Sequence, residues 1–310
     1  RITLDGILRA VFGVHDGERM DLYREAIPKI ADATGALDFL PLFNRDLGPW
    51  SRAGKFRRAL AGADRLIYEE IELRRSAGDV EERDDVLSLL LAARHEDGSP
   101  MTDVELRDQL MTLITAGHET SATGLSWAFE RLLRTPRVLE RLTADLDDDA
   151  YLDAVVKETL RSRPVILDVA RLLKHDTEIG GYTLPAGTTV LAAIAAMHAR
   201  SPAYPDWAEF RPERFLEAES QPYTWIPFGG GVRRCIGAVF AQTEMKIVLR
   251  EVLRRVRLRA DRERPESPRI KHVTVVPSRG ARVVVSERLE PLAETADAEH
   301  LSALGANAPG

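Results

Sequence analysis

The stretch FGGGVRRCIG, Phe228 to Gly237, carries the single cysteine of this 310-residue chain. Its consecutive glycines allow positive φ angles and a close approach of the backbone to a flat ligand, because no Cβ intervenes. Apolar residues then recur at helical spacing from 238 to 255. Cys235 is therefore predicted just before a helix N-terminus, where free N–H groups and the helix dipole favour a thiolate over a thiol.

Several roles are open to a lone cysteine, the commonest being that of a small buried apolar residue. Zinc needs three or four ligands, and no Cys-x-x-Cys or His-Glu-x-x-His pattern accompanies Cys235. The glycine spacings of phosphate-binding loops are absent, and no local histidine supplies the partner of a nucleophilic cysteine. One thiolate is sufficient when a macrocycle already holds the metal, as in haem.

The loop resembles the haem-ligand signature of the cytochrome P-450 monooxygenases, Phe-x-x-Gly-x-Arg-x-Cys-x-Gly. All five fixed positions match, at Phe228, Gly231, Arg233, Cys235 and Gly237. The resemblance implies a haem b cofactor with Cys235 as the axial ligand of the iron and the other four residues beside it. It also implies the fold of that family, which is mainly α with a minor β region.

Composition limits the partners of the chain. Lys and Arg total 43 against 49 Asp and Glu, a net charge of -6, so nothing attracts the chain generally to nucleic acid or anionic membranes. No apolar run is long enough to span a bilayer. A single cysteine permits no internal disulfide and is compatible with a reducing cytoplasm. We therefore expect a cytoplasmic protein without a nucleic-acid partner or a membrane segment in this chain.

The chain opens inside an apolar helical pattern that includes Ile7, Leu8 and Val11. We interpret it as the later part of a longer protein, lacking the N-terminal portion of the family it resembles. Residues 1–287 are predicted to form one haem-binding monooxygenase domain. Residues 288–310, rich in Ala, Glu and Gly without periodicity, are predicted to be a disordered tail.

Helical periodicity covers residues 1–93. Breaks are predicted where glycine or proline interrupts the pattern, at Gly13, Pro28, Gly35, Pro41, Gly48-Pro49 and Gly78. The resemblance implies that the helices within residues 21–77 form a lid over a substrate channel.

A long central helix is predicted from a capping box at Thr102 and Glu105 to about Arg134, a length of about 50 Å. Its middle contains Ala116-Gly117-His118-Glu119-Thr120. Glycine is a poor helix former, and threonine hydroxyls tend to bond back to a carbonyl one turn earlier. We therefore expect a bend here, with a groove at Gly117 that has room for dioxygen and water.

This segment resembles the oxygen-activation motif of the family, carried by Ala116, Gly117, Glu119 and Thr120. The resemblance implies that Ala116 and Gly117 lie beside the cofactor and that Glu119 and Thr120 are catalytic. Cleavage of a bound O–O bond needs two protons, which a hydroxyl that orients water and a carboxylate behind it can deliver.

A helix over 149–162 carries Glu158 and Arg161, which are three residues apart and so share a face. A glutamate followed three residues later by an arginine is common in this chain. Only the position of this pair, after the central helix, distinguishes it from the others. The resemblance adds Arg214 as a third member and implies a buried structural network behind the haem. Because a buried charge tolerates no missing partner, losing one residue is expected to prevent folding.

Strands are predicted over 169–173, 178–184 and 188–194, and a hairpin over 270–286 with its turn at Pro277 to Gly280. By resemblance, Arg171 and His198 contact the haem propionates, and residues 165–169 and 274–276 line the substrate pocket. For His198, a buried core histidine is the alternative.

The resemblance implies insertion of one atom of O2 into a small hydrophobic substrate. Electrons then come from outside, because no flavin or nicotinamide motif is present. A basic cluster is a candidate dock for an acidic ferredoxin and consists of Arg233, Arg234, Lys246, Arg250, Arg254 and Arg255. A peroxide-driven peroxygenase, a haem-thiolate isomerase and a haem-binding but inactive fragment remain alternatives.

Overall fold

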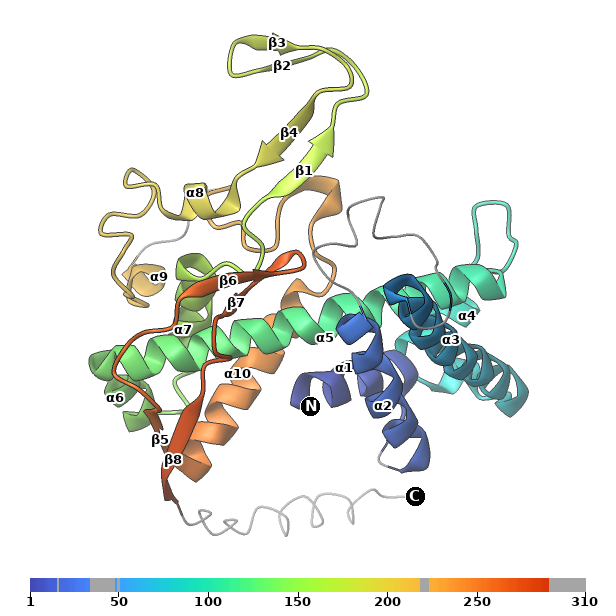
Figure 1. The fold of residues 1–310 in the computed structure, drawn as a ribbon, viewed down its shortest axis with the longest axis horizontal. Helices are drawn as coiled ribbons and strands as arrows, with labels where there is room; N and C mark the ends of the chain where they lie inside the picture. The colour runs from blue at the N-terminus through green and yellow to red at the C-terminus, as the bar shows by residue number, and fades with distance from the viewer. Residues whose placement is uncertain (16, 34–47, 49–50, 218–222, 290–310) are drawn as a thin grey trace, which may run out of the picture.

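One long helix, α5 (Asp103–Arg134), runs through the centre of the molecule and contacts helices from both halves of the chain (Figure 1). The computed structural model describes residues 1–15, 17–33, 48, 51–217 and 223–289. The Thr102 hydroxyl accepts a hydrogen bond from the Glu105 N–H, and the Glu105 carboxylate accepts one from the Thr102 N–H. The predicted capping box and both predicted ends of the helix are thus confirmed.

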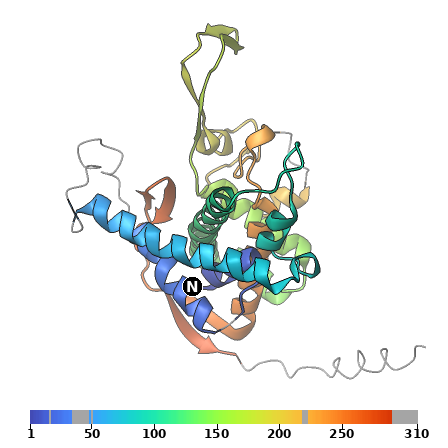
Figure 2. The ribbon, with the colours of Figure 1, turned by 90° about the vertical axis from the view of Figure 1, so that its right-hand side faces the viewer.

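The N-terminal helices surround the first half of α5. They are α1 (Ile2–Phe12), α2 (Glu18–Ala33), α3 (Arg52–Ala77), the short 3-10 turn η2 (Val80–Glu82) and α4 (Val86–Ala92). One hydrophobic cluster joins them to Leu106, Leu110 and Ile114 of α5. In the view of Figure 2, α3 crosses the front of the molecule.

Two of the predicted helix ends in this half are confirmed, and one is wrong. Gly13 and Gly78 end α1 and α3 with left-handed φ angles of 62° and 72°. The predicted break at Pro28 does not occur, because α2 continues through it. Pro28 cannot donate the backbone hydrogen bond expected at its place in the helix. Burial of Tyr23, Ile27 and other apolar residues of α2 compensates for this loss.

Some predictions fall outside the described residues. These are the breaks at Gly35, Pro41 and Pro49, and the tail from residue 290 onward. The first residues assigned to the tail are folded, because β8 (Val283–Arg288) includes Arg288 and the Leu289 N–H donates to the Arg255 carbonyl at 2.8 Å.

A second hydrophobic cluster surrounds the other half of α5. It joins α5 to α6 (Pro136–Ala144), α7 (Asp149–Ser162) and α10 (Ala238–Arg255). The ends predicted for α7 and α10 are confirmed. Gly124 of α5 lets these helices approach, since a Cβ there would lie 3.2 Å from the Met245 sulfur and 3.7 Å from a Leu160 methyl.

The first strands form an arm that projects from the helical body (Figures 1 and 2). β1 (Val169–Leu172) pairs antiparallel with β4 (Thr189–Ala192), and β2 (Thr177–Ile179) pairs with β3 (Tyr182–Leu184). The strand predicted over 178–184 is therefore two strands, which turn at Gly180 and Gly181. Short helices follow the arm, α8 (Ile194–His198) and α9 (Arg214–Glu217), so Ile194 begins a helix and does not end a strand.

The predicted hairpin over 270–286 is wrong in its pairing. β7 (Thr274–Pro277) pairs with β6 (Pro268–Lys271), whereas β8 pairs with β5 (Val256–Ala260). The turn at 277–280 exists, with Gly280 N–H donating to Pro277 C=O at 3.0 Å, but it joins two different sheets. The buried Glu266 carboxylate accepts from the Ser278 hydroxyl at 3.0 Å and from the Arg279 N–H at 2.8 Å, and so holds this turn.

Candidate functional site

The cysteine loop closes on itself and leaves its thiol exposed. The Cys235 N–H donates to the Phe228 carbonyl at 3.0 Å, across the 3-10 turn η3 (Gly231–Arg233). Gly229 and Gly231 adopt left-handed φ angles of 71° and 67°, which only glycine adopts without strain. Cys235 is a free thiol two residues before Gly237, the N-cap of α10. The predicted placement before a helix N-terminus is confirmed.

Exposed apolar side chains surround this thiol. Val232 is fully exposed, Ile236 is 89% exposed and Val239 is 74% exposed, all within one loop and the first turn of α10. Scattered apolar residues are common on protein surfaces, but a contiguous group of them marks a binding surface. A flat apolar macrocycle with a metal at its centre would cover these side chains and bring the metal to the thiol. The residues present therefore fit haem.

The base of the loop is anchored on α7 by aromatic side chains. The rings of Phe228 and Trp225 meet edge to face at 6.0 Å, and those of Trp225 and Phe215 do so at 6.3 Å. The Trp225 indole N–H also donates to the Lys157 carbonyl at 3.1 Å. Phe228 thus positions the loop from its buried side, which is consistent with its predicted place beside the cofactor.

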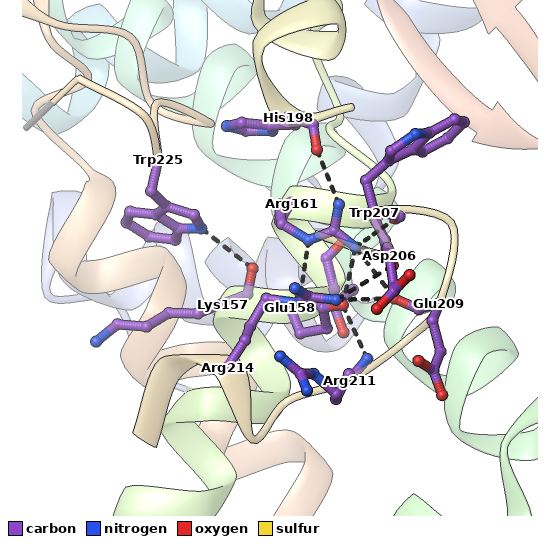
Figure 3. Close-up of polar contacts among 12 residues, drawn as sticks. Lys157, Glu158, Arg161, His198, Asp206, Trp207, Glu209, Arg211, Arg214 and Trp225 are labelled. Carbon is purple, nitrogen blue, oxygen red and sulfur yellow. Dashed lines mark hydrogen bonds and ion pairs between the residues drawn. The ribbon is translucent and has the colours of Figure 1, made fainter. Parts of the chain in front are cut away.

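Glu158, Arg161 and Arg214 form one buried charge network, as predicted (Figure 3). Arg161 binds Glu158 through two hydrogen bonds, Nε to Oε2 at 2.7 Å and Nη2 to Oε1 at 2.8 Å. Arg214 Nε lies 3.2 Å from Glu158 Oε2. No more than 6% of any of these three side chains is exposed.

Backbone groups bind several further donors and acceptors of the network, although Arg214 Nε, which is buried, makes only its ion pair with Glu158 among the described residues. Arg161 donates to the carbonyls of His198 and Trp207, each at 2.9 Å (Figure 3). Arg214 donates to the Pro205 carbonyl at 3.0 Å, and the Arg211 N–H donates to Glu158 Oε1 at 2.9 Å. The network therefore joins α7 and α8 to the irregular segment 205–211, which has little regular structure to hold it.

His198 is a buried core histidine, which is the alternative to the predicted propionate contact. Its side chain is 1% exposed, and its Nε2 accepts a hydrogen bond from the Ile226 N–H at 3.0 Å. Burial, followed by the nearby Arg161 charge, lowers the pKa of His198 to about 4, so the ring is neutral near pH 7. His198 links the charge network to the segment that enters the cysteine loop.

Helix α5 is unbroken at its centre. It is continuous from 103 to 134, and the Thr120 hydroxyl donates back to the Ala116 carbonyl at 2.6 Å, as expected. The predicted groove at Gly117 is filled, because a Cβ there would lie 2.8 Å from Ile7 Cδ1 of α1. In this structure Gly117 allows close packing of two helices. The neighbouring His118 is hydrogen-bonded to the Thr3 hydroxyl at 2.9 Å.

Glu119 has an ion-pair partner that the sequence analysis missed. Its Oε1 lies 2.8 Å from Lys271 Nζ at the end of β6. No local pattern could have indicated this contact, because the two residues are far apart in the chain and meet only when β6 and β7 pack along α5 (Figure 1).

The two arginines assigned to the cofactor are accessible. Arg171 is exposed on β1, where its guanidinium donates to the adjacent Ala170 carbonyl at 2.8 Å, and Arg233 is exposed in η3. Neither has an ion-pair partner in the part of the chain that the structure describes. The segments assigned to the substrate pocket are neighbours, since the Val275 N–H donates to the Val165 carbonyl at 2.8 Å. These assignments stay predictions.

The basic cluster assigned to a redox partner is largely neutralised within the chain. Lys246 and Arg250 bind Asp149 at 3.0 Å and 2.5 Å. Arg254 binds Asp147, and Arg255 binds Glu251 at 2.8 Å. Arg233 and Arg234 alone keep no carboxylate partner among the described residues. The predicted dock is therefore reduced to these two residues beside the cysteine.

A buried acid, Glu244 of α10, is a second feature that the sequence analysis missed. Its two carboxyl oxygens are buried and make no well-directed hydrogen bond with the described residues. It packs against α1 where Gly6 leaves space, since a Cβ on Gly6 would lie 2.9 Å from Glu244 Oε1. Burial raises the pKa of Glu244, and the Ser121 hydroxyl opposes this only in part.

Replacing Glu244 with glutamine should stabilise the protein more at pH 8 than at pH 4. A carboxyl group whose pKa is raised by folding stabilises the protein fully at any pH below its pKa in the unfolded chain. That stabilisation is lost as the pH rises through the higher pKa of the folded state. The amide has no such dependence. Urea unfolding at both pH values measures the difference. Glu251→Gln, on the same helix but at an ion-paired and more exposed site, is the control, and an equal pH response in both variants would contradict the prediction.

The fold and the site together define a class of protein. A long helix packs beside a helix that follows an exposed cysteine loop, and a buried glutamate–arginine network supports that loop from behind. The sequence profile of the cytochrome P-450 family matches residues 1–285, and the chain belongs to this family of haem proteins.

Known relatives agree with this assignment. Cytochrome P-450 135B1 of Mycobacterium tuberculosis is 46% identical over 320 residues, which cover 99% of this chain and 66% of that protein. Cytochrome P-450 135A1 of the same species is 41% identical over 302 residues, which cover 95% of this chain and 66% of that protein. The chain thus spans 66% of the length of these relatives.

Solved structures with the same fold include members of the family. The haem domain of cytochrome P-450DA superposes with a TM-score of 0.79 at 27% identity, covering 92% of this chain and 66% of that one. A retinoic acid-bound cyanobacterial CYP120A1 superposes with a TM-score of 0.77 at 27% identity, covering 93% and 67%. None of the helices described for the present chain combines the length and the apolar character that crossing a bilayer requires.

Proposed function

We propose that this chain is the haem-binding part of a monooxygenase that inserts one atom of O2 into a small hydrophobic substrate. The observation that carries the proposal is the exposed Cys235 thiol, held in a closed glycine loop among exposed apolar side chains. In the overall reaction a substrate C–H bond becomes C–OH. Two electrons and two protons reduce the second oxygen atom to water.

Haem b would bind between the cysteine loop and α5. When bound, it would supply the iron at which dioxygen is activated. Cys235 would hold the iron, and the loop residues Phe228, Gly231, Arg233 and Gly237 would lie beside the ring, with Ala116 and Gly117 on the α5 side. Arg171 would bind a propionate, because its guanidinium group is exposed and lacks a carboxylate partner within the described structure.

Glu119 and Thr120 would deliver the two protons. The Thr120 hydroxyl now donates to the Ala116 carbonyl, and rotation about its side-chain bond would allow it to orient a water molecule. The Glu119 carboxylate, 26% exposed, would take protons from solvent and pass them to that water. The two residues are consecutive in α5, which supports a hydroxyl that orients water and a carboxylate that supplies protons to it.

The source of electrons would be an external redox partner of the ferredoxin type. The exposed and unpaired Arg233 and Arg234 beside the cysteine would attract its acidic surface. A free, exposed thiol at the reacting centre is best preserved in a reducing compartment, so we infer a cytoplasmic location.

Replacing Thr120 with alanine should separate electron use from product formation. Without the hydroxyl, proton delivery loses its order, so electron consumption continues while product falls by about tenfold or more and hydrogen peroxide accumulates. Oxygen uptake, peroxide and oxidised product are measured with a ferredoxin, its reductase and a panel of small hydrophobic compounds. Thr120→Ser, which keeps the hydroxyl, is the control and should retain most of the product.

Two outcomes would count against the proposed function. Unchanged product per electron in Thr120→Ala would remove the assigned role of the hydroxyl. A wild-type, haem-loaded protein that consumes neither oxygen nor electrons with any compound of the panel would favour the inactive-fragment alternative.

A further inference from the structure

The carboxylate assigned to proton delivery is held by a distant part of the chain. Lys271 Nζ lies 2.8 Å from Glu119 Oε1, and His272 Nδ1 lies 3.8 Å from Glu119 Oε2. Oε1 is buried and makes no well-directed hydrogen bond, so its contact with Lys271 is an ion pair. This ion pair restrains the carboxylate.

The hairpin of β6 and β7 is attached to α5 at a second point. The Trp127 indole N–H donates to the Val275 carbonyl at 2.7 Å, and Trp127 is completely buried. Trp127 lies about two helical turns beyond Glu119 in α5. The hairpin therefore packs along the helix with Val275 fixed to its buried side, which brings the hairpin turn at Lys271 and His272 to Glu119 (Figure 1).

This attachment determines the direction in which Glu119 points. Consecutive residues of an α-helix differ by about 100° in direction, so Glu119 and Thr120 leave α5 on different sides. Lys271 approaches from the side of the hairpin. Its positively charged ammonium group draws the Glu119 carboxylate toward the hairpin.

We propose that Lys271 is a positioning residue for Glu119, whose carboxylate it holds directed toward the β6–β7 hairpin. The inference rests on the proposed function for its importance in proton delivery, but the ion pair itself can be tested without turnover. Lys271 lies outside both the cysteine loop and the Ala116–Thr120 segment of α5. It joins the proton-delivering segment to the hairpin whose next residues, 274–276, were assigned to the substrate pocket.

A double-mutant cycle tests whether the pair forms. Lys271→Met and Glu119→Gln are made singly and together, and the equilibrium constant of unfolding is measured for each. The coupling between partly exposed charges is modest. We therefore expect the unfolding equilibrium constant of the double variant to differ by about two- to fivefold from the value obtained by multiplying the two single effects. Lys174→Met, an exposed lysine on the β-arm, serves as the control and should be independent of Glu119→Gln.

An infrared measurement tests the positioning role. The carboxylate band of Glu119, obtained as the difference between wild type and Glu119→Gln, should shift in Lys271→Met and return in Lys271→Arg, which keeps a positive charge at this place. Independent effects in the double-mutant cycle, or a carboxylate band that Lys271→Met does not move, would each overturn the proposal. The oxygen-uptake experiment on Thr120 tests the proposed function separately, because neither measurement on Lys271 involves turnover.

Discussion

Replacing Arg161 with methionine should leave little or no folded protein. The change removes both hydrogen bonds that Arg161 donates to Glu158. The Glu158 carboxylate, which is completely buried, then lacks its main partner. Breaking a buried ion pair in this way costs about 3–5 kcal/mol. Because the whole free energy of unfolding of a domain is only about 5–15 kcal/mol, most of the stability is lost. Soluble yield, far-ultraviolet circular dichroism and the urea midpoint measure the loss.

A matched control comes from the same spacing elsewhere in the chain. Arg75 follows Glu72 by three residues but pairs on the surface with Asp103 at 2.6 Å. Arg75→Met should therefore cost no more than about 1 kcal/mol. Arg161→Lys keeps the charge without the paired hydrogen bonds and should fall between the two. If Arg161→Met unfolds at the same urea concentration as Arg75→Met, the network does not have the structural role assigned to it.

Replacing Cys235 with alanine should abolish the red-shifted Soret band that thiolate-ligated haem shows in its reduced, carbon monoxide-bound form. Cys235 is the only cysteine in the chain, so it alone can supply a thiolate, and it is exposed beside the apolar side chains of the loop. We expect the wild type to show the band and the variant to show none. The measurement is an absorption difference spectrum after reconstitution with haem.

The control for this change keeps the thiol and alters its surroundings. Val232→Ala removes apolar surface from the same loop and should weaken haem binding while preserving the position of the band. Persistence of the thiolate band in Cys235→Ala would overturn the ligand assignment. A wild type without the band would remove haem-thiolate chemistry from this chain altogether.

Much of the helical structure could be predicted from local signals. The capping box at Thr102 and Glu105 defines the start of α5, and glycine caps define the ends of α1 and α3. Such signals depend only on residues within one turn of each other. The place of Cys235 before α10 followed in the same way. The Glu158 network needed the family resemblance, because its spacing alone occurs elsewhere in the chain.

The failed predictions share a physical cause, which is packing between residues far apart in sequence. Burial of Tyr23 and Ile27 stabilises α2 across Pro28, and Ile7 fills the space expected to be a groove at Gly117. The β7 strand pairs with β6 at a turn marked by His272, which has a φ of 55°, and not at the more typical turn sequence that contains Gly280. None of these contacts leaves a pattern in its own segment.

The two hydrophobic clusters meet on a single helix. α5 contributes Ile114 to the first cluster and Leu125 to the second. The structure describes every residue between them, and of these only Ser121, Thr123 and Gly124 are buried. Glu119 and Thr120 lie in this interval, where α5 has no large buried apolar side chain of its own. The segment is held instead by the close approach of Gly117 to Ile7 of α1 and by the ion pair between Glu119 and Lys271. The residues proposed to deliver protons therefore lie between the two hydrophobic clusters, where the helix is held by close backbone packing and a charge pair.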